Sequence, residues 1–232
     1  MLIVFSSFGF MDFSHKIIDL TSQDVDSLKS KKIWSIDCPV PLSRLKKINV
    51  DYIDFEGNRK SGELLVFDVL AESVCEIFKS IYEIGFPIEK INPMQNYYGS
   101  DDKSMDDNNS SAFNGRRIMN SEKWSSHAYG MAIDINPIQN PYLVANFKSG
   151  IIKVLPLEGM NYINRINSHP AMVEKVVNLF LENGFKIWGG TWNDRIDYHH
   201  FQLEWKDIMN LSVMELEEGK EYFRNEVLIA SE

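Results

Sequence analysis

The chain of 232 residues has few cysteines, no excess of basic residues and no long apolar run, and each shortage excludes a class of protein. Its two cysteines, Cys38 and Cys75, cannot form the disulfide framework of a small secreted scaffold, and neither belongs to a CxxC pair. The apolar helical pattern around Cys75 predicts a buried thiol, whereas pairing between the two cysteines stays open. Lys and Arg number 24 against 33 Asp and Glu, a formal net charge of −9 without a basic patch, which argues against nucleic acid as the main partner.

Long apolar segments are also missing, even near the N-terminus. Residues 1–20 are rich in apolar side chains, but Asp12 interrupts them, and they carry neither a basic start nor a clear cleavage site of small residues. We interpret them as an N-terminal strand or extension, with a degenerate secretion signal as the alternative. No later segment approaches the roughly 18 uninterrupted apolar residues of a transmembrane helix, so an integral membrane protein is not expected.

What the chain does contain is typical of a soluble globular protein with one full core, at 44% hydrophobic and 25% charged residues. Strand and helix patterns are mixed without a βαβ rhythm, which predicts one α+β domain. We divide the chain into an N-terminal extension over residues 1–32, a main domain over residues 33–208 and an acidic C-terminal helix or tail over residues 209–232.

The pattern of apolar residues predicts several elements within the main domain. Residues 34–67 look strand-like, with a hairpin turn at Gly57–Asn58. Residues 69–84 place apolar side chains on one helical face, and residues 168–184 predict a second helix with Pro170 at its first position. Two long loops are expected at residues 99–115 and 136–156, and two strands at residues 185–192 and 196–205.

The segment SSHAYGMAIDINP, residues 125–137, places His127 and Asp134 seven positions apart. On a helix this spacing would separate the two side chains by roughly 10 Å along the axis, too far for one metal ion. The run MAIDI instead predicts a strand that carries Ala132 and Asp134 on one face. If Gly130 lets the chain turn sharply before that strand, His127 can fold back towards Asp134. Taken alone, the pair is more simply explained as a surface histidine and a satisfied aspartate.

A second polar cluster, from Asp197 to Gln202, makes a metal site the better explanation because it adds a third nitrogen ligand and a spare carboxylate. Two histidines and one aspartate leave a tetrahedral zinc ion one open position for water, as in catalytic sites. Asp197 could then accept a proton from that water. Strand alternation puts Asp197 and His199 on one face and His200 on the other, so it leaves open which histidine is the ligand.

Two motifs carry a family resemblance. SxHxxGxAxD is matched by Ser125, His127, Gly130, Ala132 and Asp134, and DxxHF is matched by Asp197, His200 and Phe201. Together they resemble the M15 zinc peptidases, in particular the VanY-like D-alanyl-D-alanine carboxypeptidases, and the similarity extends from about Phe55 to Gln202. The resemblance implies an α+β fold of the hedgehog and DD-peptidase type, with a small, mostly antiparallel sheet, flanking helices and a zinc cleft. Residues 33–208 would then be the peptidase domain.

The same resemblance implies the catalytic centre. The zinc ligands would be His127, Asp134 and His200, and Asp197 would be the general base. His200 is thereby preferred over His199, which replaces a residue that is commonly apolar.

Substrate-binding residues are implied in the same way. Arg116 matches an arginine that binds or polarises the substrate carbonyl, with Arg117 as the alternative, because Gly115 stands where this branch usually has a cysteine. Ser125 matches the serine of the motif, in a supporting role. Tyr129 and Trp192 are further candidates for contact with substrate, although core packing explains them equally well.

The implied activity is the zinc-dependent removal of the terminal D-alanine from peptidoglycan stem peptides. The alternatives are an endopeptidase of the L-alanyl-D-glutamate type and a non-catalytic binding module that contains zinc, and the presence of Asp197 argues against the module. Such a substrate places the protein in the cell envelope, periplasmic or extracellular. Neither an oligomeric state nor an export route follows from the sequence.

Overall fold

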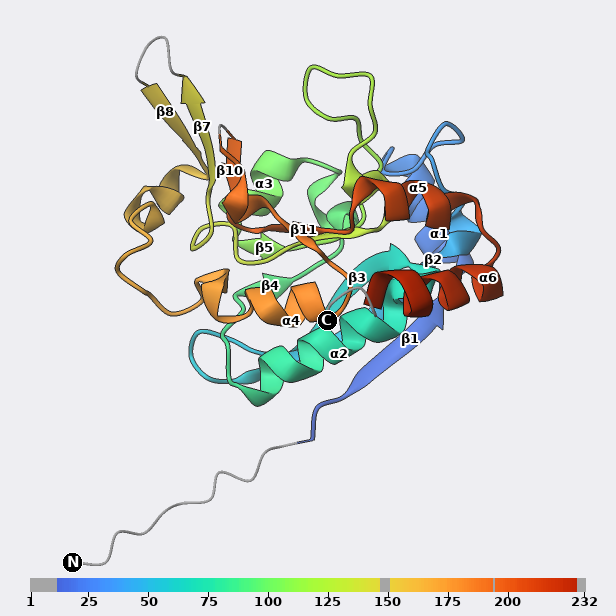
Figure 1. The fold of residues 1–232 in the computed structure, drawn as a ribbon, viewed down its shortest axis with the longest axis horizontal. Helices are drawn as coiled ribbons and strands as arrows, with labels where there is room; N and C mark the ends of the chain where they lie inside the picture. The colour runs from blue at the N-terminus through green and yellow to red at the C-terminus, as the bar shows by residue number, and fades with distance from the viewer. Residues whose placement is uncertain (1–11, 147–150, 194, 229–232) are drawn as a thin grey trace, which may run out of the picture.

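A three-stranded antiparallel sheet forms one side of the molecule (Figure 1). The computed structural model describes residues 12–146, 151–193 and 195–228. The strand order is β1-β2-β3, with β1 at His15–Asp19, β2 at Leu45–Ile53 and β3 at Arg59–Phe67. The predicted hairpin is confirmed, because β2 and β3 pair directly and Gly57 lies in their turn at a φ of +81°.

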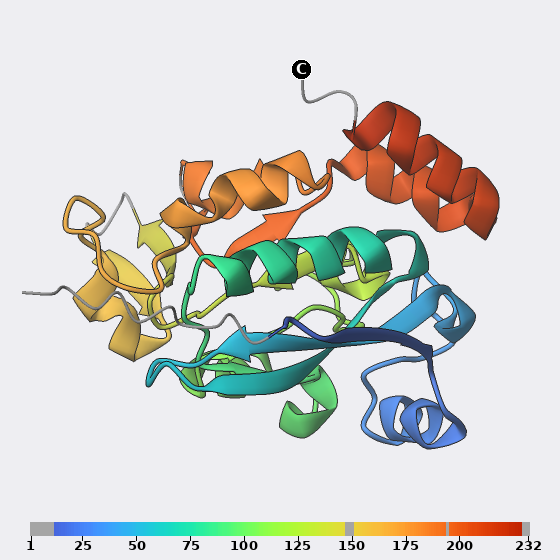
Figure 2. The same ribbon diagram turned by 90° about the horizontal axis from the view of Figure 1, so that it is seen from below.

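The helix α2, Ala71–Glu83, lies over one face of this sheet (Figure 2). The helix α4 packs against the side of α2 that faces away from the sheet. The predicted apolar face of α2 is confirmed, since Val74, Ile77 and Phe78 are all buried. Gly85 follows the helix in the left-handed region at a φ of +65°, the conformation that commonly ends an α-helix. Cys75 is buried in α2 as predicted, and both cysteines are free.

The remaining strands of the described residues are short. One sheet has the order β6-β11-β9, with β6 at Ala132–Asp134, β9 at Ile187–Trp188 and β11 at His200–Gln202. Another has the order β10-β7-β8, with β7 at Tyr142–Asn146, β8 at Ile151–Leu155 and β10 at Arg195–Asp197. β4, Lys90–Ile91, pairs in parallel with β5, Asn109–Ser110. The predicted mixture of helices with small antiparallel sheets is thus confirmed.

The other helices are short as well. The α-helices are α1 at Ser22–Ser30, α3 at Asp101–Asp106, α4 at Val177–Glu182, α5 at Trp205–Val213 and α6 at Leu216–Tyr222, and a π-helix follows at Phe223–Leu228. Turns of 3₁₀ helix lie at Leu42–Arg44, Asp68–Leu70, Met94–Tyr97, Ser126–Tyr129, Leu157–Tyr162, Val173–Lys175 and Gly189–Thr191. None of the helices in the described part of the chain has the length and apolar character needed to cross a membrane.

Two of the expected boundaries are wrong. Residues 34–41 form turns instead of a strand, because Pro39 and Pro41 have no backbone N–H to donate to a sheet. The second helix begins only at Val177, after a 3₁₀ turn, so Pro170 precedes it by several residues.

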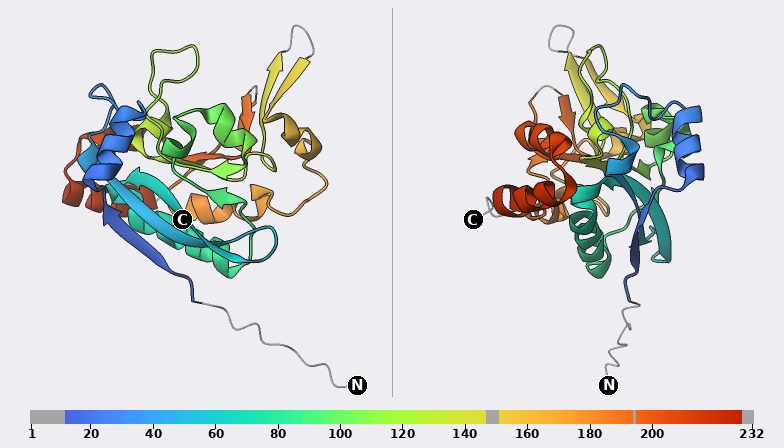
Figure 3. Two further views of the ribbon diagram at one scale, coloured as in Figure 1. Left: turned by 180° about the vertical axis from the view of Figure 1, so that it is seen from behind. Right: turned by 90° about the vertical axis from the view of Figure 1, so that its right-hand side faces the viewer.

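Both expected long loops contain regular structure. Residues 99–115 include α3, whose N-cap Ser100 accepts a hydrogen bond from the Lys103 backbone, and then β5. Residues 136–156 include the antiparallel pair of β7 and β8. These two strands and the loop at residues 115–124 project from the same side of the molecule (Figure 3).

Elements of the two predicted terminal segments pack against the rest of the chain. Within residues 1–32, β1 pairs with β2 and Leu28 of α1 is fully buried. α5 begins at Trp205, before the predicted boundary at residue 209, and both Leu211 and Phe223 are buried. The three-part division itself stays a prediction.

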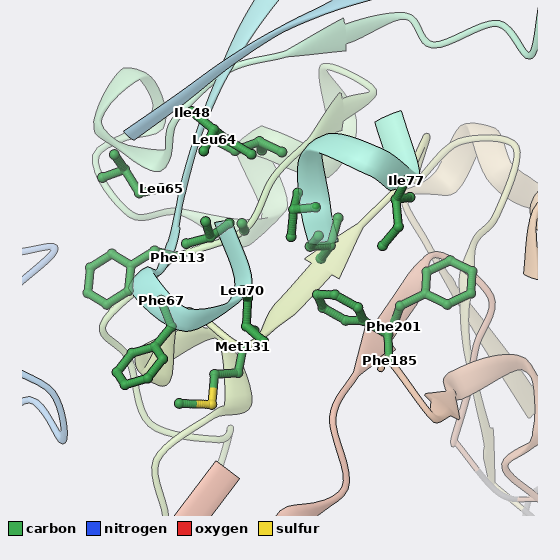
Figure 4. Packing of buried hydrophobic residues seen from close by; sticks show 14 of the residues in the cluster. Ile48, Leu64, Leu65, Phe67, Leu70, Ile77, Phe113, Met131, Phe185 and Phe201 are labelled. Carbon is green, nitrogen blue, oxygen red and sulfur yellow. The ribbon is translucent and has the colours of Figure 1, made fainter. Parts of the chain in front are cut away.

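The buried apolar side chains form one cluster that joins the sheets and helices (Figure 4). Phe67 of β3, Ile77 of α2 and Phe201 of β11 all belong to it. Phe201 stacks on Phe180 of α4 with ring centroids 4.0 Å apart. This packing fixes β11, the strand that carries His200.

Candidate metal centre and active site

The turn before β6 folds His127 back towards Asp134. His127 lies in the 3₁₀ turn Ser126–Tyr129, where its backbone N–H donates to Ser125 Oγ at 3.3 Å. Gly130 ends that turn at a φ of +70°, and a Cβ atom there would lie 2.8 Å from the backbone nitrogen of Phe67. Both the dihedral angle and the close approach require glycine.

The three predicted ligands converge at one end of this turn. Asp134 and His200 are directly opposite each other on the paired strands β6 and β11. His200 Nδ1 lies 3.0 Å from Asp134 Oδ1, and His127 Nε2 lies 3.3 Å from Asp134 Oδ2 and 3.2 Å from His200 Nδ1. Among the His, Cys, Asp and Glu side chains of the described residues, His127, Asp134 and His200 form a group that could hold a metal ion.

This spacing fits a tetrahedral zinc ion. Ligands at about 2.0–2.1 Å from a tetrahedral ion are about 3.3 Å from one another. The two histidine nitrogens are 3.2 Å apart, and each lies near one oxygen of the Asp134 carboxylate, at 3.0 Å from Oδ1 and 3.3 Å from Oδ2. With one ligand atom taken from each residue, all three atoms lie within 4.8 Å of one another. Two imidazole nitrogens and one carboxylate are also ligands that zinc commonly takes.

Two acceptors fix the orientation of the histidine rings. His127 Nδ1 lies 2.6 Å from the carbonyl oxygen of Ala112, and His200 Nε2 lies 2.9 Å from Gln202 Oε1. If each of these nitrogens carries the proton, the other nitrogen of each ring is left unprotonated and directed into the cluster, as metal ligation requires. Gln202 was missed in the sequence, although its position two residues after His200 puts both on one strand face.

Asp197 and His199 lie beside the cluster. His199 Nε2 is 2.9 Å from Asp197 Oδ1 and 3.9 Å from Asp134 Oδ2, and its Nδ1 lies 2.8 Å from the carbonyl oxygen of Asn140. Asp197 Oδ1 is buried and has no well-aligned hydrogen bond among the described residues, so its contact with His199 is an ion pair. The sequence considered His199 only as an alternative ligand, because alternation shows which face a side chain occupies but not what it meets there.

The charges in this cluster stabilise one another. Burial raises the pKa of Asp134, but the imidazoles of His127 and His199 outweigh burial and hold that pKa well below its usual range. Burial lowers the pKa of His199, yet the carboxylates of Asp197 and Asp134 raise it to about 9. The pKa of His200 is also raised, because its hydrogen bond to Asp134 outweighs burial.

The two candidate arginines have different partners. Arg116 forms an ion pair with Asp101, at the start of α3. Arg117 stacks over Trp124, with its guanidinium carbon 3.6 Å from the ring centroid, and donates to the Glu122 carbonyl. Both arginines therefore have partners within the protein, and the choice of Arg116 over Arg117 as the substrate contact stays a prediction.

The other predicted substrate contacts separate into packing and site residues. Tyr129 is buried, packs edge-on against Trp205 and donates to Met209 Sδ, contacts that are typical of a packing residue. Trp192 lies against the cluster, with its ring centroid 5.5 Å from that of His200. Ser125 is buried and caps the turn that carries His127.

A comparison with known protein families finds a match to the part of the chain that contains the three convergent side chains. Residues 119–203 match the family model described as D-alanyl-D-alanine carboxypeptidase. This segment is similar to the M15 peptidases and is VanY-like in its motifs. The match includes the three convergent side chains and Asp197, whereas Arg116 precedes it. No curated protein and no solved structure matches the chain significantly.

Proposed function

We propose that the protein is a zinc-dependent D-alanyl-D-alanine carboxypeptidase that removes the terminal D-alanine from peptidoglycan stem peptides. The observation that carries this proposal is the convergence of His127, Asp134 and His200, whose ligand atoms lie within 4.8 Å of one another, inside the segment that matches this peptidase family. We extend the proposal to a fold of the hedgehog and DD-peptidase type and to a location in the cell envelope, where the substrate lies.

The proposed mechanism uses residues on both sides of the ligand cluster. His127, Asp134 and His200 would hold the ion, which when bound supplies a Lewis acid that polarises a carbonyl and lowers the pKa of water towards about 7. Asp197 accepts the proton of the attacking water and passes it to the leaving amine. Arg116 stabilises the developing oxyanion.

The first test is the dependence of hydrolysis on zinc. A peptide that ends in D-alanyl-D-alanine should lose one D-alanine, as measured by the mass of the products. A chelator should abolish the reaction, and zinc should restore it. Protein that binds no zinc after metal-free preparation and reconstitution contradicts the proposal.

The second test addresses Asp197. Asp197→Asn should keep one zinc ion per chain while kcat falls roughly 10²- to 10⁴-fold, the usual contribution of a general base. Asp26→Asn is the matched control, because Asp26 is exposed on α1, and it should leave kcat unchanged. Full activity in Asp197→Asn would show that another group is the base.

The same assay separates the alternatives. An L-alanyl-D-glutamate-type endopeptidase would split the stem peptide into two fragments and leave the terminal D-alanine attached. A binding module would hold zinc and peptide without any product. Asp197 beside the ligand cluster favours an enzyme over the module.

A further inference from the structure

Asp197 and the ligand strands belong to different sheets. Asp197 ends β10, which pairs with β7, whereas His200 begins β11, which pairs with β6. Only Tyr198 and His199 connect β10 to β11, and both lie in a turn. The position of the Asp197 carboxylate relative to the ligands therefore depends on how this junction is held.

The side chain of His199 bridges the two sheets at this junction. It is 4% exposed, and its Nε2 lies 2.9 Å from Asp197 Oδ1 on one side and 3.9 Å from Asp134 Oδ2 on the other. Its own carbonyl accepts the N–H of Ile135 at 3.0 Å, which attaches the turn to the residue after β6. An apolar side chain of similar size could fill the space but could not hold a carboxylate.

Asn140 anchors the opposite edge of the His199 ring. The carbonyl oxygen of Asn140 lies 2.8 Å from His199 Nδ1. Asn140 is fully buried, and its side chain donates to the carbonyl of Ala171 at 2.9 Å and accepts the N–H of Val173 at 2.9 Å. Because these bonds fix Asn140, the imidazole has a rigid support and both of its nitrogens face oxygen acceptors.

We propose that His199 is a positioning residue that, anchored on Asn140, holds the Asp197 carboxylate beside the His127, Asp134 and His200 cluster. This inference rests on the proposed function, in which Asp197 is the base. His199 acts through Asp197 and touches neither the substrate nor the reacting atoms. Partners of this kind that orient a functional side chain typically change activity roughly 10- to 100-fold when removed.

Three substitutions distinguish the contribution of His199 Nε2, which faces Asp197, from that of Nδ1, which faces Asn140. In His199→Gln the amide nitrogen can reach the place of Nε2 and keep a donor towards Asp197, whereas in His199→Asn it can reach only the place of Nδ1. His199→Phe removes both donors. We expect kcat to fall roughly 10- to 100-fold in the Asn and Phe variants and less in the Gln variant, with KM and zinc content unchanged. His169→Phe is the matched control, since His169 is exposed and outside the site.

A double-mutant cycle decides whether His199 acts through Asp197. In the Asp197→Asn background, His199→Phe should change the residual kcat less than twofold, because the group that it positions is already gone. An equal loss of kcat in both backgrounds, or an Asn variant as active as the wild type, overturns the proposal. A loss of zinc from His199→Phe would overturn it too, since His199 would then serve the ligand Asp134.

A readout that needs no turnover tests the contact directly. Proton–nitrogen NMR of the wild-type protein should show a His199 Nε2–H signal that is slow to exchange, absent in His199→Phe and shifted in Asp197→Asn. A signal that Asp197→Asn leaves in place contradicts the contact, even where the Phe variant fails to fold. If the wild-type protein with zinc cleaves no stem peptide, the proposed function fails, and the NMR result still decides whether His199 holds Asp197.

Discussion

At the scale of single residues, Gly130 has the clearest structural reason for its identity. Its φ of +70° disfavours any side chain, and a Cβ would also meet backbone, at 2.8 Å from the nitrogen of Phe67. The Phe67 N–H in turn donates to the Gly130 carbonyl at 2.9 Å, so neither chain segment can move away without losing this bond. The turn that carries His127 is therefore tied to the end of β3.

We expect Gly130→Ala to destabilise the protein by about 1–3 kcal/mol and to weaken zinc binding, because relief of the contact displaces His127. Gly57→Ala is the matched control: its φ of +81° imposes similar dihedral strain, but nothing lies within 4 Å of the added Cβ. Denaturant unfolding and zinc titration of both variants measure the difference. Equal stability and equal zinc affinity in the two variants would show that the contact with Phe67 does not hold the turn.

A contact between two side chains could be predicted from the sequence where the two residues are close in the chain or belong to one motif. The approach of His127 to Asp134 follows from the glycine between them and the short strand after it. The contact of His199 with Asp197 and Asn140 does not, because Asn140 comes from a distant segment and the sequence does not show the turn that joins β10 to β11. Alternation treated Asp197 and His199 as residues of one strand, whereas the structure has a turn at Tyr198 and His199, and the contact between the two side chains forms there.

At the scale of elements, α1 is attached to the sheet through Asp24. Thr21 caps the helix with Asp24 in a capping box, and Lys47 of β2 donates to both carboxylate oxygens of Asp24, at 2.8 and 2.9 Å. Burial raises the pKa of Asp24, but the hydrogen bonds from Lys47 and Thr21 outweigh it and leave the pKa below its ordinary value of 3.8. A carboxyl group with a depressed folded-state pKa stabilises the fold above its unfolded-state pKa and loses that effect as the pH falls through the folded-state value.

Asp24→Asn should therefore lower the free energy of unfolding at pH 7 by about 1–2 kcal/mol, the usual size of a lost helix cap. The difference between wild type and variant should shrink as the pH falls below 3.8, since the wild-type carboxyl is then protonated as well. Urea unfolding at a series of pH values measures it. A difference that stays constant from pH 7 to pH 3 would mean that the charge of Asp24 plays no part.

Element boundaries were less predictable than element types. The apolar face of α2 and the β2–β3 hairpin follow from local periodicity and a glycine turn, and both are present. The pairing of β7 with β8 was expected to be a loop, because its strands stand between polar and proline-rich stretches whose composition suggested irregular structure. The start of α4 depends on tertiary contacts, since Asn140 Oδ1 accepts the N–H of Val173 in the turn before it.

At the scale of the whole molecule, the C-terminal helices complete the core. Phe223 is 4% exposed, and Gly184 after α4 approaches its ring so closely that a Cβ at Gly184 would lie 2.7 Å from Phe223 Cζ. Val227 is buried beside it. The sequence predicted an acidic helix or tail here from its charge. The structure has helices, because apolar residues between the charged ones are buried against the core.

We expect Phe223→Ala to lower the free energy of unfolding by about 3–5 kcal/mol, as removal of a buried aromatic ring leaves a cavity. Val213→Ala at the end of α5 is the control, because Val213 is 81% exposed and its truncation should change stability by less than about 0.5 kcal/mol. Denaturant unfolding measures both. Since α4 also stacks on β11 through Phe180 and Phe201, the Phe223 variant should weaken zinc binding as well, whereas a separable tail would leave zinc affinity and stability unchanged.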